Sequence, residues 1–151
     1  MNAILHFLHI AAVILWVGGM FFAHFCLRPV VAMQLPPPQR LALMSAVLGR
    51  FFAAVALSIL IILGSGLVMM LSVGMAQAPI HWHLMLASGL LMAFIFAVIY
   101  WRHYPRLRTA VIASDWPLAG AALNGIRLLV ATNLALGTAT VAIAVIGKYL
   151  G

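Results

Sequence analysis

Residues 51–73 read FFAAVALSILIILGSGLVMMLSV, an apolar run without a charged side chain. A run of this kind is long enough to cross the hydrocarbon core of a bilayer as a helix, which takes roughly 20 residues. Three further apolar runs lie at residues 3–26, 80–103 and 126–149. We therefore predict an all-α integral membrane protein, a bundle of four transmembrane helices in a single domain, residues 1–151.

The overall composition excludes the main soluble alternatives. Only 6% of the residues are charged and the mean hydropathy is +1.22, which rules out an ordinary soluble domain. The net charge of +7 comes from arginines in short connections, without the basic and aromatic patch of a nucleic-acid-binding protein. The first apolar run lacks a positive leader and a small-residue cleavage site, so we expect it to be retained as a helix.

Prolines are expected to end the helices in the two connections, residues 27–50 and 104–125. The first helix is predicted to end before Pro29, and no continuous helix is expected before Gln39, because Pro36, Pro37 and Pro38 precede it. Likewise, the third helix is predicted to stop before Pro105. The amphipathic stretches 39–50 and 106–113 are interpreted as interfacial helices that lead into or out of the membrane.

The basic residues predict the orientation of the bundle. All but one of the eight Lys and Arg residues fall in or near the two connections, and Lys148 alone lies at the other face. The positive-inside rule therefore places both connections in the cytoplasm and both termini outside, which in a bacterial inner membrane is the periplasm. The basic residues near the connections are Arg28, Arg40, Arg50, Arg102, Arg106, Arg108 and Arg127.

The balance of acidic residues and histidines limits the chemistry. Asp115 is the only acidic residue, whereas six histidines are present. Paired-carboxylate hydrolysis and oxygen cages for Ca²⁺ or Mg²⁺ are therefore excluded. The remaining donors are histidine, methionine and Cys26, which suit haem iron and soft metal ions such as Cu(I).

Two histidine pairs lie near the predicted outer ends of the first and third helices: His6 with His9, and His81 with His83. His9 and His83 fall at similar depth, so they could face each other as the two axial ligands of haem b. Interfacial histidines that bind only water or backbone are the alternative.

A second haem is an open alternative at the cytoplasmic ends of the same helices. His24 and His103 would be its ligands, and two haems would make the chain a transmembrane electron wire.

A copper site is the competing interpretation. Methionine thioethers and imidazoles together suit Cu(I), although methionine also fills gaps in apolar cores. The candidate residues at the predicted outer end are Met69, Met70, Met75, His81 and His83.

The fourth helix contains the most polar face of the protein. Asn133, Gly137 and Thr140 follow i, i+4, i+7 spacing and so share one side of the helix. We expect interhelical hydrogen bonds from this face. In the haem interpretation Asn133 would instead orient a ligand histidine or contact a propionate. The residues then predicted around the cofactor are His9, His83, His6, Trp16, Asn133 and Arg127.

The sequence resembles small members of the CopD-like family of bacterial membrane proteins over most of its length. The resemblance implies an inner-membrane helical protein linked by name to copper uptake or resistance. It is carried by residues 5–10 (LHFLHI), 16–22 (WVGGMFF), 83–85 (HLM), 104–108 (YPRLR), 115–117 (DWP) and 126–130 (IRLLV).

A more distant resemblance connects His9, residues 16–19 and Trp82-His83 to HemJ, a four-helix haem-binding protein associated with protoporphyrinogen oxidation. Proteins of the HemJ type carry a lysine shortly after the third-helix histidine. This chain has Met85 there and no lysine before Lys148. The resemblance therefore implies a porphyrin pocket and disfavours protoporphyrinogen oxidation.

Three functions follow as hypotheses from the sequence. The first is a haem b protein with a redox or electron-transfer role, working with a quinone or another membrane redox protein; if enzymatic, it would be a membrane oxidoreductase. The second is a copper permease or chaperone. The third is a non-catalytic accessory subunit of a respiratory complex, and a homo-oligomer is compatible with all three.

Overall fold

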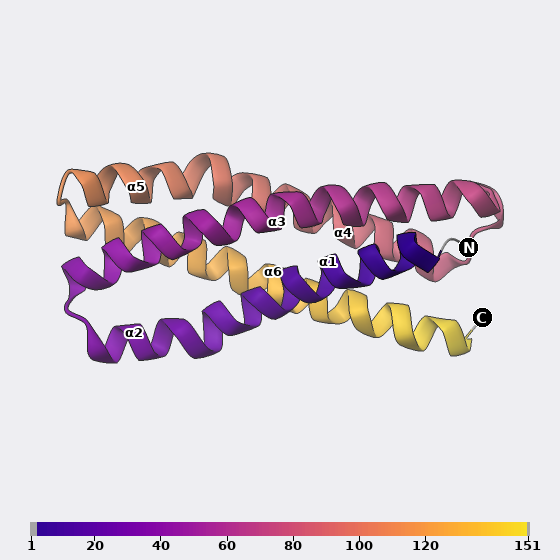
Figure 1. Cartoon of the computed structure of the whole chain (residues 1–151), viewed down its shortest axis with the longest axis horizontal. Coiled ribbons are helices and arrows are strands. Elements are labelled where there is room, and N and C mark those ends of the chain that lie inside the picture. The colour runs from indigo at the N-terminus through magenta and orange to yellow at the C-terminus, as the bar shows by residue number, and fades with distance from the viewer. Residues whose placement is uncertain (1–2, 151) are drawn as a thin grey trace.

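The computed structural model describes residues 3–150, which form four long helical rods without a strand (Figure 1). Each rod is long and apolar enough to span a membrane, which confirms the predicted four-helix bundle. In chain order the rods are α1 (Ala3–Phe21) continued by a π-helical segment (Phe22–Leu27) and α2 (Arg28–Gln34); α3 (Pro37–Val73); α4 (Ile80–Val98) continued by a π-helical segment (Ile99–His103) and α5 (Tyr104–Ile112); and α6 (Trp116–Leu150).

The rods run up and down, so the bundle has two distinct ends. Both chain termini and the turn between α3 and α4 lie at one end, which we call the terminal end (Figure 1). The α2–α3 and α5–α6 turns lie at the other, which we call the arginine end. The positive-inside rule predicts that the arginine end faces the cytoplasm.

Helical structure continues past Pro29 and Pro105, contrary to the prediction from sequence. In both cases a π-helical segment immediately precedes, and the proline occupies the first turn of the α-helix that follows. Proline is tolerated there because a first-turn N–H needs no helical acceptor. The wider π-helical turn changes the hydrogen-bond register. The proline therefore neither breaks an α-helical hydrogen bond nor clashes with a carbonyl group of the preceding turn.

The start of α3 is also earlier than predicted. The helix begins at Pro37, two residues before Gln39, with prolines in its first positions and Pro36 extended before it. The reason is the same: the missing N–H groups of Pro37 and Pro38 fall where an α-helix leaves its donors unpaired. Residues 37–50 are therefore the first turns of the same continuous helix that carries residues 51–73.

The rods pack mainly in two pairs. α1 packs along α3, and α4 packs along α6, while α3 and α6 also touch each other. α1 and α4 therefore lie on a diagonal of the bundle and make few direct contacts in the described part. The core occupies the middle and the arginine end, where its largest fully buried side chains are Phe52, Met20, Ile99, Leu107 and Ile126.

Large apolar side chains cover the outside of every rod. Ile14, Leu60, Phe94 and Val145, one from each rod, are all more than half exposed. A water-soluble bundle would place polar residues at such positions, so this surface fits a lipid environment.

The polar face of α6 makes the interhelical hydrogen bonds that the sequence predicted. Asn133 Nδ2 donates to Met92 O of α4 at 3.0 Å, and Thr140 Oγ1 donates to Ser88 Oγ at 2.8 Å. Between them Gly137 lets Val17 and Met92 approach, since a Cβ there would lie 3.0 and 3.1 Å from their side chains. This face therefore holds α4 and α1 against α6.

Gly74 ends α3 with φ at +95°, a conformation that L-residues rarely adopt. Replacing Gly74 by alanine should lower the free energy of unfolding by about 1–3 kcal/mol. Gly64 is the control, because it lies inside α3 and a Cβ there would meet nothing within 4 Å. Unfolding by sodium dodecyl sulfate in mixed micelles would compare the two variants. Equal stability of Gly74→Ala and Gly64→Ala would contradict the prediction that the positive φ of Gly74 makes a side chain destabilising there.

Candidate functional site

His9 of α1 is fixed by a hydrogen bond to the neighbouring rod. Its Nδ1 lies 2.7 Å from Oγ of Ser65 on α3. The Ser65 hydroxyl donates to the carbonyl groups of Ile61 and, at 3.2 Å, Ile62. Since a hydroxyl has one proton, Ser65 Oγ accepts from His9 Nδ1–H. The neutral imidazole then leaves the Nε2 lone pair free for a metal ion.

Two further donors lie one helical turn from this hydrogen bond. Met69 follows Ser65 by four residues and shares its face of α3, and His6 precedes His9 by three residues on α1. Because α1 and α3 are antiparallel, both steps lead toward the terminal end (Figure 1). Helical spacing therefore places the exposed His6 and the half-buried Met69 one turn from the His9–Ser65 hydrogen bond, toward the terminal end.

The other methionines of the predicted copper set occupy different surroundings. Met70 is 3% exposed and belongs to the buried interior. Met75 is exposed in the turn between α3 and α4. Met69 is therefore the methionine of this set that combines partial exposure with the face of α3 that carries Ser65.

His81 and His83 lie at the start of α4, at the terminal end. His81 packs against α6, because a Cβ on Gly147 would lie 2.7 Å from His81 Cβ. His83 is half-buried and is rotated from His81 by about 200° on the helix. The two histidines therefore point in different directions from α4.

His9 and His83, the predicted axial ligands, are on the two diagonal rods. α1 packs along α3 and α4 along α6, and α3 and α6 touch each other. His9 itself is directed toward α3 by its bond to Ser65. The structure therefore does not bring His9 and His83 together across a shared helix interface.

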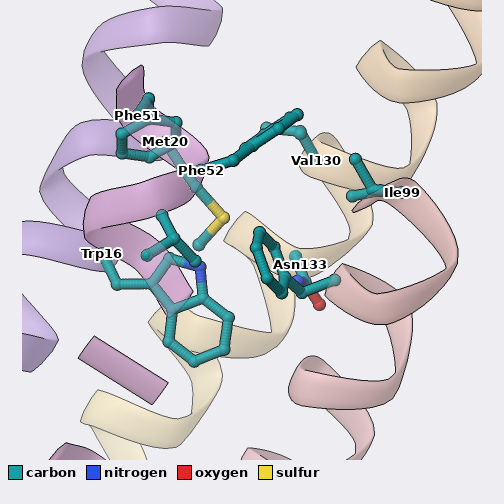
Figure 2. A pocket seen from close by; sticks show the side chains of 9 residues that line it. Trp16, Met20, Phe51, Phe52, Ile99, Val130 and Asn133 are labelled. Carbon is teal, nitrogen blue, oxygen red and sulfur yellow. The ribbon is translucent and has the colours of Figure 1, made fainter. Parts of the chain in front are cut away.

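Trp16 and Asn133 lie deeper, around a small cavity in the middle of the bundle (Figure 2). Its volume is about 10 Å³, and Met20 and Phe52 also line it. A cavity of this size holds at most one water molecule. Asn133 Oδ1 has no hydrogen-bond partner within the described residues, whereas its Nδ2 binds Met92 O. Trp16 and Asn133 thus line a buried cavity that His9 does not line.

Arg127, His24 and His103 lie toward the arginine end. The length of α6 from Arg127 to Gly147, which contacts His81, is about 30 Å, so Arg127 does not share a site with the outer histidines. His103 packs against Gly125 of α6, whose Cβ would lie 2.7 Å from His103 Nδ1. The π-helical segment that carries His24 also contacts α6. Both histidines of the predicted second site therefore lie on segments that pack against α6.

Protein ligands for a metal are sparse. Within residues 3–150 no group of three or more histidine, cysteine, aspartate or glutamate side chains could hold a metal ion. A centre built from the described residues must therefore include methionine, or must hold a cofactor such as haem that supplies its own donors.

Two features of the site were missed by reasoning from the sequence. Ser65 was treated as a small residue for helix packing, although a serine between Gly64 and Gly66 in an apolar run is a signal for a polar contact at a close approach. Apart from Arg127, which the haem interpretation placed near the cofactor, the arginines were treated only as signals of orientation. In the structure Arg28, Arg40 and Arg127 line one pocket.

The fold and the histidine–serine pair define a multi-pass helical membrane protein with imidazole and thioether donors at one end. The sequence model of the family described as Copper resistance protein D matches residues 45–146. Because this match covers more than half of the chain, the protein belongs to that family, as its resemblance to CopD-like proteins implied. No curated protein and no solved structure matches the chain.

Proposed function

We propose that this protein binds and handles Cu(I) as its cargo in the membrane. The observation that carries the proposal is the hydrogen bond from His9 Nδ1–H to Ser65 Oγ, which leaves Nε2 free as a metal ligand. An outer hydrogen bond of this type fixes the tautomer and orientation of a ligand histidine. Membership of the Copper resistance protein D family supports a role related to copper.

His9, His6 and Met69 are the proposed Cu(I) ligands. Thioether and imidazole are soft and borderline donors that Cu(I) accepts at low coordination number, whereas the chain offers no carboxylate there to favour harder cations. Met75 and His83, exposed and half-buried at the same end, would serve as first contacts for an arriving ion. If the terminal end faces the periplasm, as the arginines predict, copper would arrive from that compartment.

Haem b with a redox role is the second candidate, and one observation favours it. The free Nε2 of His9 would suit haem iron as well as it suits Cu(I). His83 lies on α4, which packs mainly along α6, whereas His9 lies on α1, which packs mainly along α3. We therefore place copper before haem.

A metal and spectral measurement on the purified chain tests the proposal. The protein in mild detergent should take up about one Cu(I) per chain in competition with a chromogenic Cu(I) chelator, as expected for a single three-donor site. The same sample should be examined for a haem Soret band after expression with added haem. Absence of competition for Cu(I) would contradict the proposal. A Soret band lost in both His9→Ala and His83→Ala would instead support haem.

A further inference from the structure

A polar pocket lies at the arginine end, far from the proposed copper ligands. Its volume is about 180 Å³, and it is enclosed by α2, the first turns of α3 and the first third of α6. Arg28, Arg40 and Arg127 line it, one from each of these helices, together with Asn124. Segments distant in sequence therefore bring three guanidinium groups to one place.

These three arginines differ from the other four. Arg28, Arg40 and Arg127 are half-buried, whereas the remaining arginine side chains are exposed. The positive-inside rule requires cationic residues at this end, but it does not require three of them to converge on one pocket. Orientation in the membrane therefore does not account for the arrangement.

The pocket has no negative charge to balance it. Arg28, Arg40 and Arg127 line the same pocket, and all three are half-buried. Asp115 is the only acidic side chain of the sequence, and it is exposed and accepts from Leu118 N at the start of α6. It lies about 18 Å along the helix from Arg127. The three guanidinium groups therefore repel one another without a carboxylate to compensate.

We propose that Arg28, Arg40, Arg127 and Asn124 bind a phosphate group. Guanidinium groups bind phosphate through paired hydrogen bonds, and Asn124 adds an amide donor. The phosphate could belong to the headgroup of an anionic phospholipid or to a soluble phosphate. Basic pockets between membrane helices at the cytoplasmic side are known to hold anionic headgroups.

The test uses the full chain in detergent and two variants, Arg127→Gln and Arg102→Gln. Arg102 is the matched control, because it is an exposed arginine in the same half of the bundle. One arm measures thermal unfolding with inorganic phosphate against chloride at equal ionic strength. The other arm measures retention of phosphatidylglycerol against phosphatidylcholine by native mass spectrometry.

We expect phosphate or phosphatidylglycerol to bind the wild type and Arg102→Gln, with affinity for Arg127→Gln weaker by at least about tenfold. Binding only of phosphatidylglycerol would identify a lipid headgroup, and equal binding of inorganic phosphate would identify a soluble ligand. Without ligand, Arg127→Gln should be at least as stable as the wild type, because it relieves repulsion. Equal loss in both variants, or no binding of either ligand, would overturn the proposal.

Discussion

Cu(I) affinity should fall by at least about 100-fold when His9 is replaced by alanine, because the variant loses a direct ligand. His9 is half-buried between α1 and α3, and its Nε2 is the nitrogen that the Ser65 hydrogen bond leaves free. Competition with a chromogenic Cu(I) chelator on the purified variant measures the loss. Thermal unfolding of the same sample shows whether the bundle remains folded.

Two control variants separate ligation from packing. Ser65→Ala keeps the imidazole but removes the group that fixes its tautomer, so a loss of about tenfold is expected. His24→Ala removes another half-buried histidine from the same rod, near the arginine end, and should bind Cu(I) like the wild type. Wild-type affinity in folded His9→Ala would contradict the role of His9, and an equal loss in His24→Ala would indicate a general effect on the fold.

The four rods could be predicted from the sequence because apolar length is nearly sufficient to define a membrane helix. Residues 51–73 contain no charge, and backbone groups in lipid must be satisfied within the helix. The ends of the rods were harder to predict. Pro29 and Pro105 are helix-ending residues by local rules, but the π-helical segments before them place each proline in a first turn.

The candidate site was predictable in its chemistry but not in its partners. Composition alone leaves histidine and methionine as the main donors, and the arginine count places His6 and His9 together at one end. Hydropathy does not say which rods pack side by side. All four rods are apolar around most of their surface, so the pairing of α1 with α3 and the contact of His9 with Ser65 appear only in the folded structure.

Asn133→Asp should be the most destabilising single substitution considered for the bundle, with a loss of about 2.5–3.5 kcal/mol in the free energy of unfolding. Asn133 is 1% exposed in the middle of α6, and its Nδ2 donates to Met92 O. An ionised carboxylate cannot donate that hydrogen bond, and it would place a charge beside a carbonyl oxygen in an apolar interior. Unfolding by sodium dodecyl sulfate in mixed micelles measures the difference.

Asn133→Leu is the matched control, because leucine has similar size and no polar atom. The substitution removes the hydrogen bond to Met92 O, an oxygen that belongs to the backbone of helix α4. It also removes Oδ1, a buried oxygen without a partner in the described part. Since interhelical hydrogen bonds in membrane proteins average about 0.6 kcal/mol, the net change should stay within about 1 kcal/mol. If Asn133→Leu lost as much stability as Asn133→Asp, shape around the small central cavity, and not charge, would control this position.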